Sequence, residues 1–279
     1  MKTINTKPEL SVVVAHYKSK FIKKVINNLL SMKKVSLEIF LINDHVESIK
    51  KNTPYLKDKR VRYIQHKQNI GSLATFNEGV KMSKRKYILI SSDHDFFEKD
   101  ALKKLIRPID NNKNYAAAFS NFNLVNERGQ ILKRYIRSSN HFSYMSYSNN
   151  FFRALKYYLD PEHFGKAVFI YSVFKTKFFD KEKFHRFHKK YGLNADRIFV
   201  YDIIQNNKIY YVKDTLFTAI IHSENFYKKR IKKDSKIKYF YLQILGYFEN
   251  SRSLILKFFI IILFPYKLYQ HVMRKFLFK

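Results

Sequence analysis

The chain has 279 residues, which is enough for one large α/β domain or for a domain with an appendage. Hydrophobic residues make up 46% of the chain and aromatic residues 17%, so a core can form and disorder of the whole chain is excluded. The absence of cysteine excludes disulfides and thiolate metal sites, and the formal net charge of +32 suggests a polyanionic neighbour, either nucleic acid or an anionic membrane face.

The first half of the chain alternates short apolar runs with helical patterns. Leu10–Ala15 is a β-branched run without polar interruption, which predicts a strand covered on both faces. It is too short for a secretory signal, and the lack of disulfides fits a reducing cytosol. Further strands are predicted at Leu37–Ile42, Val61–Gln65 and Tyr87–Ser91, and helices at Phe21–Met32, Ser72–Met82 and Lys99–Ile106. This order predicts an α/β fold with an open, mostly parallel, doubly wound sheet.

The second half of the chain is less regular. Asn126–Gln130 (NERGQ) is predicted as a turn between two strands, and the aromatic, serine-rich segment Phe142–Leu159 shows no clear period. The remaining predicted elements are a helix that begins near Asn194, strands at Lys208–Val212 and Leu216–Ile221, and a helical C-terminus from Ser235 that breaks at Pro265.

Polar residues follow the ends of the predicted strands. In open α/β sheets, ligands bind at the carboxyl ends of the strands, and His16, Asp44, Asn69, Asp93 and Asp95 all fall there. Alternate residues of an extended segment point the same way. Asp93 and Asp95 are therefore expected to address one hard divalent cation, Mg²⁺ or Mn²⁺. The alternative is a solvated loop in which Asp95 caps the next element.

Read together, these segments resemble the family 2 glycosyltransferases, which are nucleotide-sugar enzymes with the GT-A fold. The resemblance covers roughly residues 10 to 225. It rests on LSVVVAHYK (Leu10–Lys18), LEIFLINDHVES (Leu37–Ser48), QNIGSLATFNEGV (Gln68–Val80), the DxD motif Asp93-His94-Asp95, and ADRIFVYDIIQNNKIYYVKDTLFTAIIHSEN (Ala195–Asn225). Three positions depart from the family pattern: Ala15 replaces the usual proline, His45-Val46-Glu47-Ser48 replaces an Asp-Gly-Ser run, and Ala195 precedes Asp196 where an acid is common.

The resemblance implies a role for each matched position. Asp196 would be the catalytic base, and a bound divalent cation would neutralise the departing nucleoside diphosphate. The donor nucleotide would be bound by Ala15, Tyr17, Asp44, Asn69, Gly71, Asn77 and Asp93. The metal would be bound by Asp93, Asp95 and His222.

Simpler roles are open for the same residues. Asp44 suits an ordinary turn, Gly71 a helix-entry turn, and His222 a half-buried histidine held by backbone. Asp196 in the first turn of a helix is favoured by the macrodipole, with Asn194 as its cap. His185 and His188 have no third ligand nearby in the sequence, so they are expected on a solvated helix face.

The C-terminal region combines basic residues with an apolar stretch. Lys228–Lys238 (KKRIKKDSKIK) precedes Leu254–Tyr269, which Lys257, Pro265 and Lys267 interrupt. The uninterrupted part is shorter than the ~20 residues of a spanning helix. Such a segment suits the membrane interface and anionic headgroups. The alternative is a helix packed on the catalytic domain.

We therefore predict a GT-A domain at 1–227, with a nucleotide-sugar half at about 8–122 and an acceptor half at about 123–227. A helical, membrane-interfacial tail follows at 228–279. The expected activity is metal-dependent, inverting transfer of a sugar from a nucleoside-diphosphate donor to a growing bacterial surface glycan, lipopolysaccharide or capsule. The acceptor would be a glycan or a lipid-linked glycan. The expected location is the cytoplasmic, inner face of the plasma membrane, by peripheral attachment.

Two other classes of protein remain as alternatives. The net charge would suit a nucleic-acid-binding protein, but no RNP, KH or helix-turn-helix pattern is apparent, and acids at strand ends would repel a polyanion. No nucleic acid is therefore expected as a partner, and an AT-rich genome would also explain the excess of lysine. A nucleotidyltransferase would show a glycine-rich loop after the first strand, whereas His16–Phe21 contains no glycine.

Overall fold

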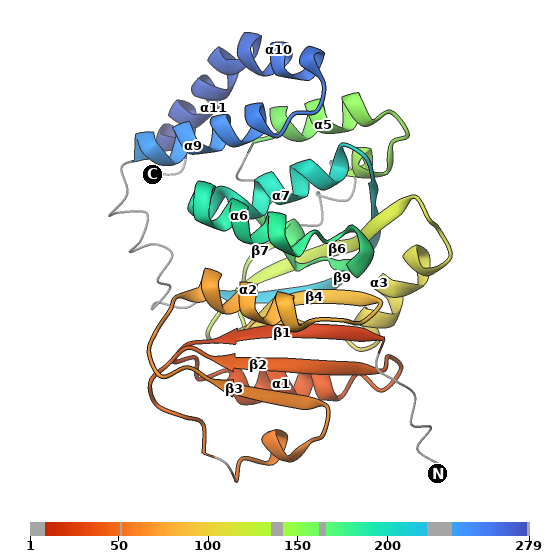
Figure 1. The fold of residues 1–279 in the computed structure, drawn as a ribbon, viewed down its shortest axis with the longest axis vertical. Coiled ribbons are helices and arrows are strands. Elements are labelled where there is room, and N and C mark those ends of the chain that lie inside the picture. Colours follow the sequence, from red (N-terminus) through yellow and green to blue (C-terminus); the bar gives the residue numbers. More distant parts are fainter. Residues whose placement is uncertain (1–8, 51, 135–141, 162–165, 222–235, 278–279) are drawn as a thin grey trace.

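The computed structural model describes residues 9–50, 52–134, 142–161, 166–221 and 236–277, and one mixed sheet runs through it (Figure 1). The strands are β1 (Leu10–His16), β2 (Leu37–Asn43), β3 (Val61–Gln65), β4 (Tyr87–Ser92), β5 (Asp95–Phe97), β6 (Tyr115–Asn126), β7 (Ile131–Arg134), β8 (Val173–Lys175) and β9 (Lys208–Ile221). Within the described residues, their order is β3-β2-β1-β4-β8-β6-β9-β5, and β7 pairs with β6.

The helices lie against the sheet or extend from it toward one end of the molecule (Figure 1). They are α1 (Ile22–Leu30), α2 (Ser72–Met82), α3 (Ala101–Asp110), α5 (Asn150–Leu159), α6 (Lys181–Tyr191), α7 (Ala195–Ile204), α9 (Lys236–Glu249), α10 (Leu254–Ile262) and α11 (Phe264–Leu277).

The first four strands pair in parallel, as the sequence predicted, and β6 and β9 form a further parallel pair. Both faces of the part formed by the first four strands are covered. Val12 and Val14 of β1 belong to the main core cluster, whereas Val13 and Ile42 form a separate cluster against Phe76 of α2. Because successive side chains of a strand point to opposite faces, the uninterrupted apolar run of β1 matches helices on both sides.

Gly79 lets α2 lie unusually close to the sheet. A Cβ at this position would lie 2.2 Å from Val13 Cγ1 and 3.0 Å from Ile42 Cδ1, which is closer than real Cβ contacts allow. Gly71, which precedes α2, has a φ of 88°, a conformation that glycine adopts without steric cost. The two glycines of QNIGSLATFNEGV therefore fix where α2 begins and how closely it packs.

The later strands differ from the prediction. β9 is one strand of 14 residues, whereas the sequence predicted two. The sequence suggested a loop at Lys213 and Asp214. In the structure the β6–β9 register shifts there, since Ser120 pairs with Val212 and the next residue, Asn121, pairs with Thr215. The side chain of Asn121 donates to Lys213 O. Pairing along β6 therefore holds the two residues in one strand as a bulge.

Three further elements depart from the sequence prediction. β5, with three residues, is too short for a periodic signal and forms by antiparallel pairing with β9. α5 lies in the segment that showed no clear period. α3 begins two residues later than predicted and continues past Ile106, through Pro108, to Asp110. The NERGQ turn is confirmed, since Asn126 N donates to Gln130 O at 2.9 Å between β6 and β7.

The C-terminal helices pack on the rest of the chain along one face. A Cβ at Gly246 of α9 would lie 2.1 Å from Ile198 Cδ1 of α7, and Tyr158 Oη donates to Ile260 O at 3.1 Å. Tyr247 is fully buried in the main cluster. The predicted boundary between residues 227 and 228 falls outside the described residues. The region after it shares its core with α5 and α7.

The break near Pro265 lies just before the proline. α10 ends at Ile262 and α11 begins at Phe264, so Pro265 stands in the first turn of α11, where its missing N–H costs no hydrogen bond. A second interruption, between Glu249 and Leu254, was not predicted.

Candidate active site

Strand register brings the predicted donor residues to one edge of the sheet. Ala15 pairs with Ile42 of β2 and with Ser92 of β4, and Asp44 N donates to His16 O at 2.9 Å. The loop after β1, the end of β2 and the turn after β4 therefore meet at the carboxyl ends of the strands, where ligands bind in open α/β sheets.

Asp93 is the centre of the hydrogen bonds at this edge. Its Oδ2 accepts from His16 Nδ1 and from Tyr17 N, each at 2.9 Å. Ser19 Oγ donates to Asp93 O at 2.9 Å. Lys18 has a φ of 58°, and this left-handed residue turns the chain between Tyr17 and Ser19. The loop after β1 is thus wrapped around Asp93, and strained backbone of this kind concentrates at functional sites.

The histidine of the DxD motif lies against the first of its two acids. His94 Nδ1 lies 3.0 Å from Asp93 Oδ1. Burial lowers the pKa of His94, but the hydrogen bond with Asp93 and the charges of Asp95 and Asp93 outweigh it, so this pKa is raised. Burial also disfavours the charge of Asp93, yet the hydrogen bonds from His16 and His94 lower its pKa to about 2.

Asp95 has a different environment from Asp93. It is only 2% exposed, and its Oδ2 accepts from Ser92 N at 2.9 Å. Burial raises its pKa. Asp93 and His94 form a turn between β4 and β5, so the extended backbone expected across the motif is wrong. The shared direction of the two carboxylates does not follow from strand alternation.

The two carboxylates of the DxD turn are suitable ligands for a divalent cation, and a bound diphosphate would supply further oxygen ligands to the same ion. Mg²⁺ is usually held by one or two carboxylates together with substrate phosphates and water. Within the described residues, Asp95 Oδ1 accepts no hydrogen bond, and Asp93 Oδ1 is engaged only by the partly exposed His94. No group of three or more His, Asp or Glu residues suited to a metal occurs in the described part of the chain. His222, the third predicted ligand, lies outside the described residues.

Asp44 holds the loop that begins α2. Its Oδ1 accepts from Ile70 N and its Oδ2 from Gly71 N, each at 2.8 Å. His66 Nδ1 lies 2.9 Å from Asp44 Oδ1, and His66 Nε2 lies 2.6 Å from Glu78 Oε2. The carboxylate therefore serves the loop directly, and its role in binding a nucleoside stays a prediction.

His66 joins Asp44 to helix α2. Burial lowers the pKa of His66, but the hydrogen bonds with Asp44 and Glu78 and the charges of the two acids raise it overall. Asn69, beside the clamped backbone, is exposed at the surface of the loop, where a ligand can reach its side chain.

The structure connects Asn77 to Asp196, two residues singled out separately. Asn77 Nδ2 lies 3.2 Å from His188 Nδ1, and His188 Nε2 lies 3.2 Å from Asp196 Oδ1. The prediction of a solvated face is wrong for His188, which is 6% exposed. Asn77 therefore faces a histidine of α6, and its role in nucleotide binding stays a prediction.

The start of α7 also differs from the expected helix cap. The side chain of Asn194 does not cap the helix. Its Oδ1 accepts from Arg197 Nη1 at 3.2 Å and its Nδ2 donates to Tyr239 O at 2.9 Å. Farther along α7, Asp202 forms ion pairs with Lys183 at 2.8 Å and with Arg252 at 3.1 Å. Asp202 is thus committed to structure, whereas the side chain of Asp196 remains 31% exposed.

A polar cavity of about 360 Å³ lies at the same edge of the sheet. Its lining residues are Asn126, Glu127, Arg128, Gln130 and Ile221. Ile221 is two residues beyond Ala219, the partner of Asp95 in the β5–β9 pairing, and Lys20 of the β1 loop forms an ion pair with Glu127. The cavity therefore adjoins the DxD turn.

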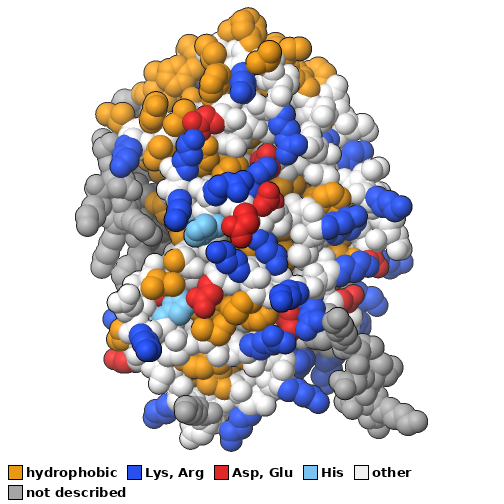
Figure 2. Space-filling model, in the orientation of Figure 1, with side chains coloured by type: hydrophobic (Ala, Val, Ile, Leu, Met, Phe, Trp, Pro, Cys, Tyr) orange, Lys and Arg blue, Asp and Glu red, His pale blue; other side chains and the backbone are white. Residues whose placement is uncertain are grey.

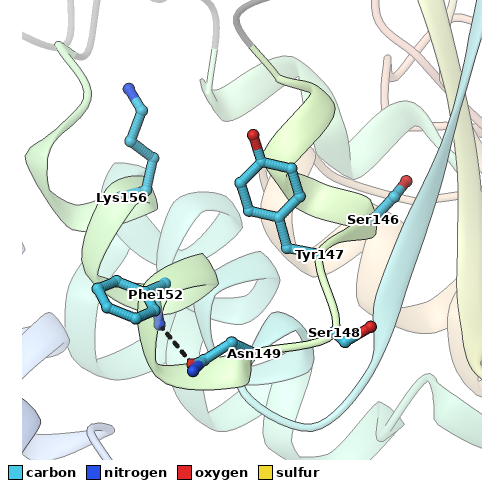
Figure 3. A pocket seen from close by; sticks show the side chains of 6 residues that line it. All are labelled: Ser146, Tyr147, Ser148, Asn149, Phe152 and Lys156. Atoms are coloured by element: carbon cyan, nitrogen blue, oxygen red, sulfur yellow. Dashed lines mark hydrogen bonds between the residues drawn. The ribbon is translucent and has the colours of Figure 1, made fainter.

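A larger hollow of about 640 Å³ lies at the N-terminus of α5. It is lined by Ser146, Tyr147, Ser148, Asn149, Phe152 and Lys156 (Figure 3). Asn149 Oδ1 accepts from Phe152 N at 3.1 Å and so caps α5. Ser146 Oγ donates to Ile209 O, at the opposite end of β9 from Ala219. Ile209 and Ala219 are ten residues apart along β9, and at about 3.3 Å per residue the hollow lies roughly 30 Å from the DxD turn. The hollow is therefore not part of the donor site.

Four residues of this edge received no role from sequence reasoning. Ser19 and His66 were passed over, whereas His16 was named only as a polar residue at a strand end and His94 only as the middle of the DxD motif. Three of them are histidines next to the end of a strand, and each contacts an acid that the sequence did single out. Histidine beside a strand-end carboxylate is the signal that could have found them.

The fold and this edge define an α/β protein with carboxylates at the carboxyl ends of its parallel strands, where ligands bind in open α/β sheets. The profile of Glycosyl transferase family 2 matches residues 11–183, and the chain belongs to this family. It is a glycosyltransferase, and the GT-A fold class predicted from the sequence is confirmed.

Similar proteins span archaea and bacteria. An uncharacterized glycosyltransferase of Methanocaldococcus jannaschii is 27% identical over 245 residues, which is 85% of this chain and 79% of the relative. One from Rickettsia felis is 29% identical over 128 residues, which is 45% of this chain and 21% of the relative.

Solved structures with the same fold include TarS of S. aureus. Residues 1–349 of TarS superpose with a TM-score of 0.59 at 16% identity, over 88% of this chain and 66% of that chain. The complex of TarS 1–349 with UDP-GlcNAc gives a TM-score of 0.58 at 15% identity, over 88% and 68% of the two chains. This chain thus spans about two thirds of the TarS fragment.

Proposed function

We propose that the protein transfers a sugar from a nucleoside-diphosphate donor to a hydroxyl of a growing surface glycan. The observation that carries the proposal is the meeting of the β1 loop, the Asp44-clamped loop and the DxD turn at one edge of the sheet. TarS, which shares the fold, has been solved with UDP and with UDP-GlcNAc. Uridine diphosphate is therefore the first donor nucleotide to test.

The donor diphosphate would lie against Asp93 and Asp95. A divalent cation held by these two carboxylates would neutralise the charge that develops on the leaving diphosphate. The loop backbone around Tyr17 and Gly71 would line the nucleotide, with Asn69 exposed to it. The polar cavity beside Ile221 offers amide, carboxylate and guanidinium groups of the kind that bind sugar hydroxyls.

Asp196 is the proposed base of an inverting transfer. The acceptor hydroxyl would lose its proton to the Asp196 carboxylate while its oxygen attacks the anomeric carbon. The bond from that carbon to the diphosphate oxygen breaks, and its electron pair leaves with the nucleoside diphosphate. A partly exposed carboxylate can meet an acceptor that enters from solvent.

Stabilisation by nucleotides tests the donor site. UDP with Mn²⁺ should raise the melting temperature, because a ligand at 100 times its Kd stabilises the native state by about 2.7 kcal/mol, which is a shift of roughly 5 °C for a chain of this size. UDP or Mn²⁺ alone should give less. A shift with single-stranded nucleic acid and none with any nucleoside diphosphate would favour the nucleic-acid-binding alternative.

We also propose that α10 and α11 attach the enzyme to the anionic inner face of the plasma membrane. Figure 2 shows hydrophobic side chains gathered over the end of the molecule formed by these helices, with Lys and Arg around them. The exposed large hydrophobic residues of these two helices, which we call the apolar face, are Leu254, Ile255, Phe258, Ile261, Ile262, Phe264, Tyr266, Leu268, Tyr269 and Val272. Such attachment would suit a lipid-linked acceptor.

The lysines that interrupt the apolar sequence do not interrupt this face. Lys267 is 2% exposed, and its Nζ donates to Asp160 O at 3.0 Å. Lys257 lies over the ring of Phe248. Among the described helices, none alone has the length and apolarity to cross a membrane. Leu254–Ile262 and Phe264–Met273 meet those criteria only as a pair bent by 48°.

Substitutions on the apolar face test the membrane proposal better than truncation, because Tyr247, Leu256 and Ile260 of the tail are buried in the core. The wild-type chain should sediment with phosphatidylglycerol vesicles, and part of this binding should weaken with salt. Phe258→Glu together with Ile261→Glu should abolish most of it, because charge is costly at apolar depth.

Leu132→Glu is the matched control, since Leu132 is 55% exposed on β7. It should sediment like the wild type. Equal sedimentation of the double variant, or no vesicle binding by the wild-type chain, would contradict attachment through this face.

A further inference from the structure

Three helices converge on the side chain of His188. Asn77 comes from α2, His188 from α6 and Asp196 from α7, and the two contacts of the imidazole each measure 3.2 Å. Asn77 and His188 are separated by 111 residues in the sequence. The contacts therefore join the helix that follows the donor loop to the helix that carries the proposed base.

The chemistry of the three groups selects one tautomer of the histidine. The amide nitrogen of Asn77 can only donate, so the imidazole Nδ1 that faces it accepts. The proton of a neutral imidazole then resides on Nε2, which faces Asp196 Oδ1 and donates to it. Asn77 thus sets the histidine in the form that can hold a carboxylate.

Burial makes the histidine a rigid support. The side chain of His188 is 3% exposed, against 31% for that of Asp196. The imidazole packs edge-on against Phe184, with ring centroids 4.2 Å apart. Asp196 Oδ2 accepts no hydrogen bond from the described residues. One carboxylate oxygen is therefore tied to the interior, and the other is available to a substrate.

We propose that His188 is a positioning residue that orients the Asp196 carboxylate, with Asn77 selecting its tautomer. The proposal rests on the proposed role of Asp196 as base. A base must be held in reach of the proton that it accepts, and a misplacement of about 1 Å can cost about 10²-fold in rate. A side chain in the first turn of a helix is otherwise free to rotate. The hydrogen bond from the anchored Nε2–H removes this freedom from the Asp196 carboxylate.

Two substitutions of His188 separate positioning from packing. His188→Phe keeps a ring against Phe184 but removes the donor, and should lower kcat by about 10–100-fold with the donor KM changed less than about twofold. His188→Gln places an amide N–H near the original Nε2 and should restore most of the lost kcat. His185→Gln, on the same helix, is the control and should leave kcat and KM unchanged.

The donor-induced melting shift of each variant shows whether the fold and the donor site are intact. If His188→Phe melts and binds UDP with Mn²⁺ like the wild type, and its kcat is also unchanged, the positioning role is overturned. If His188→Gln is as slow as His188→Phe, then the ring, and not the donated hydrogen bond, is what matters, and the proposal also fails.

The double variant with Asp196→Asn distinguishes this inference from the function on which it rests. When His188 acts through Asp196, His188→Phe should cost little further kcat in the Asp196→Asn background. If the kcat losses of the two single variants were fully additive in the double variant, the positioning role of His188 would be overturned, while the role of Asp196 as base would stand. Normal turnover by Asp196→Asn alone would remove the base and the inference together.

Nitrogen-15 NMR of the imidazole provides a readout without activity. His188 should show a protonated Nε2 and an unprotonated Nδ1, and the Nε2 resonance should move in Asp196→Asn. A neutral ring protonated on Nδ1, or an Nε2 resonance that does not shift in Asp196→Asn, would overturn the proposed Asn77–His188–Asp196 hydrogen bonding.

Discussion

Asp196→Asn should lower kcat by about two orders of magnitude or more, because a positioned general base contributes typically ~10²–10⁴-fold. The amide keeps the shape of the side chain and an oxygen that can accept from His188 Nε2. Donor affinity and melting temperature should therefore change little. Steady-state kinetics with the donor titrated at saturating acceptor, together with thermal unfolding, check the three quantities.

Asp202→Asn is the matched control on the same helix. Asp202 is 8% exposed and paired with Lys183 and Arg252, so its loss should lower the melting temperature and leave kcat close to the wild-type value. A slight loss of stability with normal turnover in Asp196→Asn would mean that this acid serves only the start of α7.

Asp93→Asn and Asp95→Asn should each abolish transfer and remove the part of donor affinity that depends on Mn²⁺. Each substitution replaces a charged oxygen ligand by a neutral amide at the proposed cation site. Calorimetric binding of UDP with and without Mn²⁺ measures this dependence. Near-normal turnover together with Mn²⁺-dependent donor affinity in either variant would remove that residue from the site.

The two variants should differ in stability without metal. Asp93 contacts His16 and His94, so Asp93→Asn removes the charged partner of the buried His16 and the partly exposed His94 and should lower the melting temperature. Asp95 is buried with Ser92 as its hydrogen-bond partner, and a neutral amide removes the cost of burying its charge. Asp95→Asn should therefore melt at or above the wild-type temperature. The opposite order would show that His94 supports Asp95 more than Asp93.

Local sequence patterns were sufficient where a segment's own residues decide its structure. β3 and α2 have the predicted bounds, and β1, β2 and β4 each extend one residue beyond them. Their apolar runs, helical periods and glycines are local signals. The acids at the carboxyl edge follow from the same reading, because parallel strands end together. The family resemblance then led to the fold class, which the comparisons confirm.

Contacts between distant segments decided the rest. β5 exists because β9 pairs with it, and β9 is continuous because β6 absorbs Lys213 and Asp214 as a bulge. The tail is half buried because α5 and α7 offer it an apolar surface. No period within these segments carries that information.

The amino-acid sequence by itself determined that this protein is a doubly wound α/β glycosyltransferase with acids at the carboxyl edge of its sheet. Only the tertiary structure decided that Asp93 is wrapped by the β1 loop, that Asp44 clamps the start of α2, and that His188 is buried between Asn77 and Asp196. The physical reason is that hydrophobic periodicity acts within one element, whereas a hydrogen bond between side chains 111 residues apart forms only after the packing of three helices has brought them together.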